Sequence, residues 1–156
     1  MEALLPKEQP LIGTHPLFGP DSVARLGLPG RRIAFCSLRA TAKQAEAVRS
    51  LLTALKLQII ETTPEDHDRQ MARSQALVHL LGRAFANLKL EKQEMSTPDY
   101  ESLLNINSLV NNDSWQLFFD MQRYNPYAAP MRRALRNSLE EIEELIGKAN
   151  RQTSSR

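Results

Sequence analysis

The hydrophobic and polar positions of the first sixty residues predict a mixed segment of strands and one helix. Short apolar runs at 11–14, 32–36 and 57–61 predict strands, and the third also alternates and is rich in β-branched residues. Between the last two runs, the apolar spacing over 41–55 predicts a helix with one buried face; its apolar positions are 45, 48, 51, 52 and 55. The stretch 17–30 is rich in glycine and proline, which predicts a structured loop.

From Thr63 onward the pattern predicts only helices. Thr63 and Pro64 have the residue types of an N-cap and a first helical position, and this helix is expected to run to about Leu88. Further helices are expected from 96–99 to about 111, over 115–123 and over 131–146. The predicted fold class is α+β, a short α/β segment followed by an all-α helical domain. The predicted division is a flexible lead-in at 1–10, the α/β segment at 11–62, the helical domain at 63–149 and a flexible tail at 150–156.

The composition excludes several classes of protein. In 156 residues, 42% are hydrophobic and 24% charged, which is typical of globular proteins and not of disordered ones. The formal net charge of +2 is too small for a dedicated nucleic-acid binder, and no apolar run is long enough to span a membrane. The single cysteine, Cys36, and a start without the features of a secretory signal favour a cytoplasmic location.

Neither a metal site nor a dinucleotide loop is predicted. On one continuous helix, His67 and His79 would lie about 18 Å apart along the axis, too far to share a metal. The six glycines, at 13, 19, 27, 30, 82 and 147, do not make the G-x-G-x-x-G spacing of a phosphate-binding loop.

His15 is the most informative candidate for chemistry. It follows a predicted strand and precedes Pro16, which biases its backbone toward an extended conformation. An imidazole in such a position can act as a general base near neutral pH. The alternative is a turn histidine that is hydrogen-bonded to a backbone carbonyl.

Two motifs resemble those of the prephenate and arogenate dehydrogenases. The segment 14–22, THPLFGPDS, is similar to the family's H-P-M/L-F-G-P signature, and 63–68, TPEDHD, is similar to its S/T-P-E-x-H-D segment, with His79 twelve residues after His67. Residues 112–115 and 124–126 give a third, weaker match, so the resemblance extends from about 11 to 147.

The resemblance implies an enzyme of tyrosine biosynthesis that oxidatively decarboxylates prephenate or arogenate with hydride transfer to NAD or NADP. It implies that His15 is catalytic and that His79 positions the substrate, although a core histidine is the alternative for His79. It implies a homodimer formed through the helical half. It also implies that 11–62 are the last α/β elements of the family's N-terminal Rossmann domain and that 63–149 is its helical dimerisation and substrate domain. The Gly-rich part of the Rossmann domain, which binds the nucleotide in the family, is not represented in the sequence, so the chain alone is expected to be inactive.

One departure from the family concerns the arginine that holds the ring carboxylate of the substrate. No arginine lies between Arg83 and Arg123, so Arg123 is the candidate for substrate binding, with Arg69 and Arg73 as alternatives. A second hypothesis is a non-catalytic helical module, descended from the family, that dimerises or regulates. The sequence leaves open the choice between the two substrates and between the two nucleotides.

Overall fold

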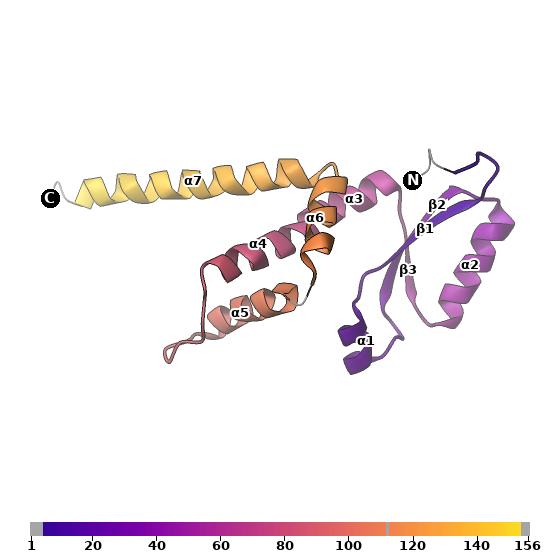
Figure 1. Cartoon of the computed structure of the whole chain (residues 1–156), viewed down its shortest axis with the longest axis horizontal. Coiled ribbons are helices and arrows are strands. Elements are labelled where there is room, and N and C mark those ends of the chain that lie inside the picture. Colours follow the sequence, from indigo (N-terminus) through magenta and orange to yellow (C-terminus); the bar gives the residue numbers. More distant parts are fainter. Residues whose placement is uncertain (1–4, 112, 154–156) are drawn as a thin grey trace. The chain divides into compact units, whose positions relative to one another are not determined.

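The structure is a computed structural model that describes residues 5–111 and 113–153. The chain divides into two compact units, the first ending at His67 and the second beginning at Asp68. The first unit is built on a sheet and the second on helices (Figure 1). The predicted α+β fold class is therefore confirmed.

A three-stranded sheet forms the centre of the first unit. Its order is β1 (Leu11–Pro16), β2 (Arg32–Arg39) and β3 (Gln58–Glu61), with β1 antiparallel and β3 parallel to the central β2. All three strands occur where the sequence predicts them, and β1 also includes His15 and Pro16. Proline is tolerated there because β1 is an edge strand of this sheet.

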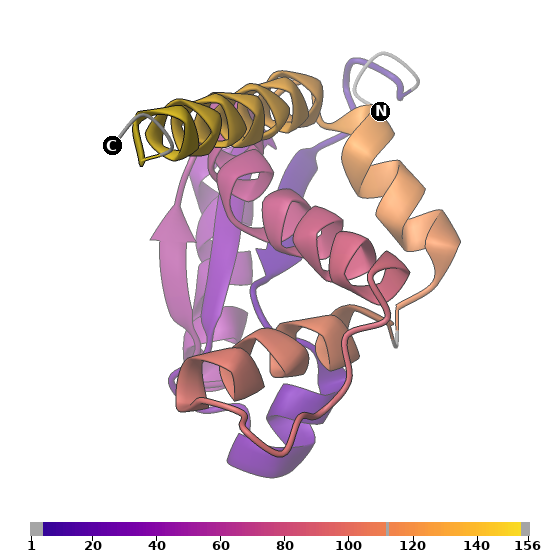
Figure 2. The ribbon, with the colours of Figure 1, turned by 90° about the vertical axis from the view of Figure 1, so that its left-hand side faces the viewer.

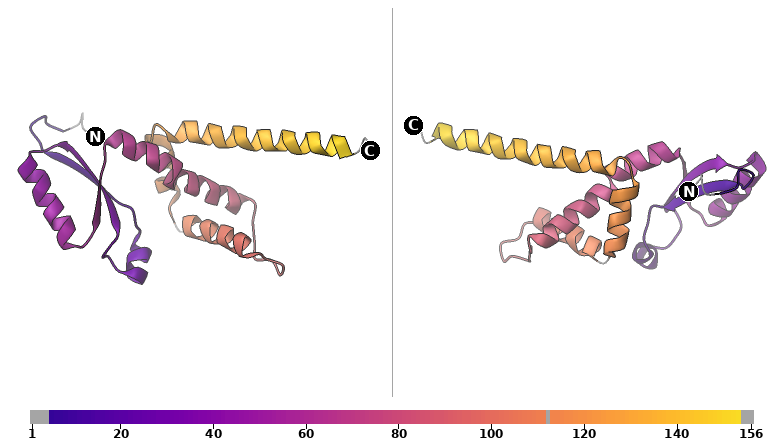
Figure 3. Two further views of the ribbon diagram at one scale, coloured as in Figure 1. Left: turned by 180° about the vertical axis from the view of Figure 1, so that it is seen from behind. Right: turned by 45° about the horizontal axis from the view of Figure 1, so that its top comes forward.

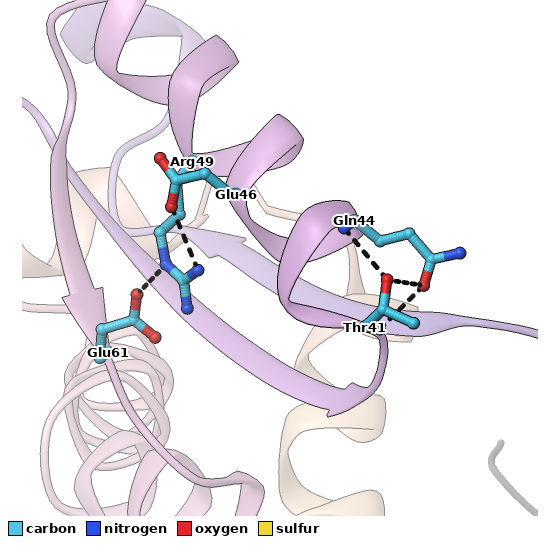
Figure 4. A network of polar contacts seen from close by, with 5 residues as sticks. All are labelled: Thr41, Gln44, Glu46, Arg49 and Glu61. Carbon is cyan, nitrogen blue, oxygen red and sulfur yellow. Dashed lines mark hydrogen bonds and ion pairs between the residues drawn. The ribbon is translucent and has the colours of Figure 1, made fainter.

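Helix α2 (Ala42–Ala54) links the two parallel strands and covers one face of the sheet. Its Ala45 and Leu52 pack against Ile33 and Phe35 of β2, and Phe35 is completely buried. The helix begins with a capping box, which satisfies two backbone donors of its first turn; the residues that form it are Thr41 and Gln44 (Figure 4).

A charged contact on the same helix joins α2 to the third strand. The Arg49 guanidinium donates to Glu61 of β3 across 2.6 Å and lies 3.6 Å from Glu46 (Figure 4). Its guanidinium carbon also lies 4.8 Å from the centre of the Phe35 ring. The hydrogen bond to Glu61 raises the pKa of Arg49 above its ordinary value, so this side chain stays charged.

A short helix, α1 (Pro20–Leu26), occupies the stretch that was predicted to be a loop. The prediction was wrong because proline and glycine mark the two ends of this helix and do not interrupt it. Pro20 is at its first position, where a missing N–H costs nothing, and Gly27 ends it with a φ of 75°.

The prediction of a single long helix from Pro64 to about Leu88 is also wrong. Two helices occur instead, α3 (Pro64–Arg73) and α4 (Gln75–Asn87), and Ser74 between them has a non-helical φ of −107° and ψ of −84°. The Ser74 hydroxyl donates to the carbonyl of Gln70 across 2.8 Å, a contact that commonly bends helices. The predicted start is confirmed, because the Thr63 hydroxyl accepts from the backbone N–H of Asp66.

Helix α4 is the centre of the second unit and contacts three other helices, α5 (Pro98–Asn111), α6 (Trp115–Tyr124) and α7 (Ala128–Thr153). Figure 2 shows α4 and α5 side by side. They approach closely because Gly82 of α4 has no side chain: a β-carbon built there would lie 2.8 Å from Cβ of Val110. Helices α5 and α6 begin where the sequence predicts, and each follows a hydroxyl N-cap, Thr97 for α5 and Ser114 for α6.

Helix α7 is longer than the predicted 131–146 and reaches Thr153 (Figure 3). Residues 150–153, expected in a flexible tail, are therefore helical, whereas 154–156 and 1–4 lie outside the described residues. Two side chains of α6 and the turn after it join neighbouring helices: Gln122 donates to Ala76 of α4, and Asn125 donates to Asp68 of α3. Among the helices of the described residues, none is long and apolar enough to cross a membrane.

Candidate functional site

The ring of His15 lies against the ring of His67, which comes 52 residues later in the chain. Nδ1 of His15 and Nε2 of His67 are 2.9 Å apart, and the ring centres are 5.1 Å apart at an interplanar angle of 71°. Both residues are half-buried and belong to the first unit. The structure therefore pairs the predicted catalytic residue with a histidine for which the sequence suggested no partner.

The strand register decides which face of the sheet carries His15. His15 is opposite Ala34, whereas the adjacent Ile33 and Phe35 point into the core that α2 covers. Because successive side chains of a strand alternate between faces, His15 is on the face away from α2. There its ring is aligned by the pairing of β1 with β2 and by Pro16.

Burial is the main reason that the pKa of His15 is lowered from its ordinary value, and the charge that His67 acquires on protonation lowers it further. A lowered pKa keeps the ring neutral at neutral pH. A neutral ring retains a lone pair on one nitrogen, so His15 is equipped to accept a proton.

A second polar cluster lies in the second unit, around His79 of α4. Nδ1 of His79 is 3.6 Å from the carboxylate of Asp113, and Arg83, one turn later on α4, donates to the backbone carbonyl of Asp113. The Arg83 guanidinium lies 4.2 Å from the centre of the Trp115 ring. Burial lowers the pKa of His79; the charge of Asp113 raises it, and that of Arg83 lowers it.

The arginines proposed for the ring carboxylate lie elsewhere in the second unit. Arg123 is exposed in the last turn of α6, with its guanidinium 5.7 Å from the ring of Tyr124. Arg69 and Arg73 line a hollow of about 240 Å³ beside Tyr127 and Met131. No contact among the described residues brings Arg123 to His79.

Sequence reasoning did not single out Arg83 and suggested no partner for His67. The straight helix assumed in excluding a metal shared by His67 and His79 does not exist, because α3 and α4 are separate. Arg83 is the buried charged residue of the described core, with 8% of its surface exposed. Its spacing of four from His79 places both on one side of α4, and that spacing was the available signal.

Gly13 lies inside β1 and not in a loop: a β-carbon built there would lie 3.7 Å from Cβ of Cys36 and 4.0 Å from Cδ1 of Leu38. This glycine therefore offers no open backbone loop to cradle a phosphate. Within residues 5–111 and 113–153, no group of three or more His, Cys, Asp or Glu side chains is arranged to hold a metal ion.

Comparison with known proteins finds similarity to dehydrogenases in both sequence and fold. The family model described as "TYRAAT1-like, C-terminal domain" matches residues 84–156. The solved prephenate dehydrogenase of A. aeolicus, in complex with hydroxyphenyl propionate and NAD⁺, superposes with a TM-score of 0.65 at 19% identity, covering 88% of this chain and 51% of that one. Synechocystis arogenate dehydrogenase gives 0.59 at 18% identity, covering 91% and 54%.

Among curated proteins, the chain is 30% identical over 154 residues to arogenate dehydrogenase 2, chloroplastic, of Arabidopsis thaliana. That match covers 95% of this chain and 43% of the relative, so the chain spans less than half of the relative's length. The resemblance predicted from the two histidine motifs is thus confirmed: the chain matches the C-terminal portion of the arogenate and prephenate dehydrogenases.

Proposed function

We propose that the chain supplies the proton acceptor and the substrate-binding helices of an arogenate or prephenate dehydrogenase. The observation that supports this most directly is the half-buried His15, whose pKa is lowered and whose Nδ1 is engaged by His67. In this proposal, as the ring hydroxyl of the substrate becomes a carbonyl, its proton passes to the neutral imidazole of His15. Loss of CO₂ then leaves an aromatic ring, which makes the reaction favourable.

The hydride acceptor of the family is NAD or NADP, and we propose that residues outside this chain bind it. The isolated chain is therefore expected to give no NADH or NADPH with either substrate. A test of the proposed activity therefore requires a nucleotide-binding domain. That domain can be taken from Synechocystis arogenate dehydrogenase and fused to the N-terminus of the full chain.

With that fusion, we expect turnover of prephenate, arogenate or both. His15→Asn should lower kcat by roughly 10²- to 10⁴-fold, the usual contribution of a general base. Lys92→Ala, in an exposed loop, is the matched control and should leave kcat unchanged. A folded fusion that is inactive with both substrates, or that is equally active without His15, would refute the proposal.

We also propose that His79 and Arg123 bind the substrate. His79 is mostly buried beside the carboxylate of Asp113, whereas Arg123 is exposed, so the effects of substituting each can be measured separately. In the fusion, Arg123→Ala and His79→Asn should each raise KM more than they lower kcat. If Arg123→Ala leaves KM unchanged, another arginine holds the ring carboxylate, and Arg69 and Arg73 are the next variants.

The partner that we propose is a second copy, bound through α7. Its later half exposes an apolar row, with 58% of Leu139, 50% of Ile142, 63% of Leu145 and 50% of Ile146 accessible. Basic residues at 132, 133 and 136 come before acidic residues at 140, 141, 143 and 144. An antiparallel copy sets the basic part of each α7 against the acidic part of the other.

A hollow of about 430 Å³ at the basic end supports the same arrangement, because Leu80, Leu135 and Leu139 line it together with those arginines. Light scattering should give a dimer, and Ile142→Asp should give a folded monomer. Converting Arg133 and Arg136 to Glu should weaken the dimer, and adding Glu140→Arg and Glu144→Arg should restore it. A parent chain that is monomeric at micromolar concentration refutes the proposed dimer.

A non-catalytic module that only dimerises or regulates is the second candidate function, and the exposed face of α7 favours it. The two candidates differ in the fusion experiment, where such a module gives a dimer without turnover. For either function we propose a cytoplasmic location.

A further inference from the structure

We propose that His67 is a positioning residue that fixes the tautomer of His15: its Nε2 accepts a hydrogen bond from Nδ1–H of His15 and leaves the lone pair on Nε2 of His15. The inference rests on the proposed function only for its catalytic consequence. The contact itself is a property of the first unit, with the two nitrogens 2.9 Å apart.

Backbone hydrogen bonds fix the positions of both histidines independently. His15 is fixed by the antiparallel register that sets it opposite Ala34 of β2. The segment before His67 is tied to the same strand, because the N–H of Thr62 donates to the carbonyl of Phe35 across 3.0 Å. The next residue, Thr63, caps α3, and its carbonyl accepts from the N–H of His67 across 2.9 Å. Both histidines are thus anchored to β2.

The proton inventory of two imidazoles limits this contact to two arrangements. A neutral ring has one N–H and one lone pair, so either His15 donates from Nδ1 or His67 donates from Nε2. If both rings were protonated, the N–H on Nδ1 of His15 would face the N–H on Nε2 of His67, and the two positive charges would repel. This repulsion is consistent with the lowered pKa of His15.

Only one of the two arrangements gives a base. If His15 donates from Nδ1, its Nε2 keeps the lone pair and can take a proton from a substrate hydroxyl. If His67 donates, Nε2 of His15 carries the N–H and can only donate. Among the described residues, no hydrogen bond occupies Nε2 of His15, so this nitrogen is the one available for substrate. The bond made by one ring nitrogen therefore determines what the other can do.

The tautomer is measurable in the full chain without any turnover. With only three histidines, two-bond ¹H–¹⁵N spectra of ¹⁵N-histidine-labelled protein can be assigned by substitution. At a pH well above the titration of His15, we expect a protonated Nδ1 and an unprotonated Nε2 on His15. A His15 ring that is protonated on Nε2 in the parent chain overturns the inference.

Two substitutions of His67 then test its role. His67→Ala should move the His15 proton toward Nε2, because the acceptor is lost. It should also raise the pKa of His15, because the smaller side chain leaves the ring less buried and the repelling charge is gone. His67→Gln offers an amide oxygen as acceptor and should restore the Nδ1–H form. Lys92→Ala, at an exposed loop position outside the proposed site, is the matched control and should leave the His15 signals unchanged. Unaltered His15 signals in a folded His67→Ala chain overturn the inference.

The fusion enzyme separates this inference from the proposed function. We expect His67→Ala to lower kcat on the order of 100-fold, within the range of general-base effects, with little change in KM, and His67→Gln to recover most of it. If the spectra behave as expected and His15→Asn leaves turnover unchanged, the proposed function fails while the tautomer assignment stands. If His15 is essential and His67→Ala alters neither spectra nor kcat, the positioning role fails alone.

Discussion

The contact between Gly82 and Val110 predicts that Gly82→Ala will destabilise the helical unit. A β-carbon on residue 82 would lie 2.8, 2.9 and 3.0 Å from Cβ, Cγ2 and Cγ1 of Val110, which is 2% exposed. Carbon atoms normally approach to about 3.5–4.0 Å, so the new methyl group would overlap three atoms by roughly 0.5–1 Å.

Two opposing effects decide whether Gly82→Ala lowers or raises the free energy of unfolding. Overpacking of this kind costs about 1–3 kcal/mol, and the upper part applies because Val110 is branched, buried and unable to swing aside. Alanine also favours a helix interior by about 1 kcal/mol over glycine. The net loss of unfolding free energy is therefore about 2 kcal/mol, which corresponds to a fall in Tm of about 4–8 °C.

Urea unfolding followed by the fluorescence of Trp115 measures this loss, since Trp115 lies in the same unit. Gly147→Ala is the matched control: its β-carbon would meet only Arg151, at 3.7 Å, so this variant should be at least as stable as the parent. A Gly82→Ala chain with unchanged or greater stability refutes the close packing of α4 on α5.

Three further predictions concern pH, capping and the nucleotide. The pKa values of His15 and His79 are both lowered from 6.5, so the unfolded chain binds more protons just below that pH, and the free energy of unfolding should fall as pH drops through 6.5. This fall should be smaller in His15→Asn and in His79→Asn. Denaturation midpoints on either side of pH 6.5 measure the fall, and a flat profile contradicts the burial of both rings. Thr41→Ala removes the capping box of α2 and should cost about 1 kcal/mol in the unfolding of the first unit, with Ser37→Ala, an exposed position on β2, as the comparison. Calorimetric titration of the isolated chain with NAD⁺ should show no saturable binding. Binding with micromolar affinity would contradict the proposal that residues outside this chain bind the nucleotide.

The sequence was most informative where a local rule decides the structure. Thr63, Thr97 and Ser114 were identifiable as helix starts because a hydroxyl side chain satisfies an N–H only three residues away. Ser74 was not, because a serine within a helix is usually tolerated, and its bond to Gln70 competes only weakly with the helix.

The candidate site was predictable in part for the same reason. His15 stands out in the sequence because Pro16 follows it, and the resemblance to the dehydrogenase motif implies its catalytic role. Its contact with His67 crosses 52 residues and depends on the register of β1 and on the bond from Thr62 to Phe35, neither of which leaves a pattern along the chain. The burial of Arg83 likewise follows from the packing of α4 beside Trp115, and not from neighbours in sequence.

The charge order along α7 also bears on how this helix acquires its structure. From 137 to 146 every residue is exposed, so the helix there relies on weak pairs along its own surface, Arg136 with Glu140 and Glu144 with Lys148, each worth about 0.2–0.5 kcal/mol. A segment with so little support is marginally helical in water. In the dimer that we propose, the ordering of this segment and its self-association would be a single coupled event. Amide hydrogen exchange between 139 and 150 should then slow as the protein is concentrated, while exchange in β2 stays the same.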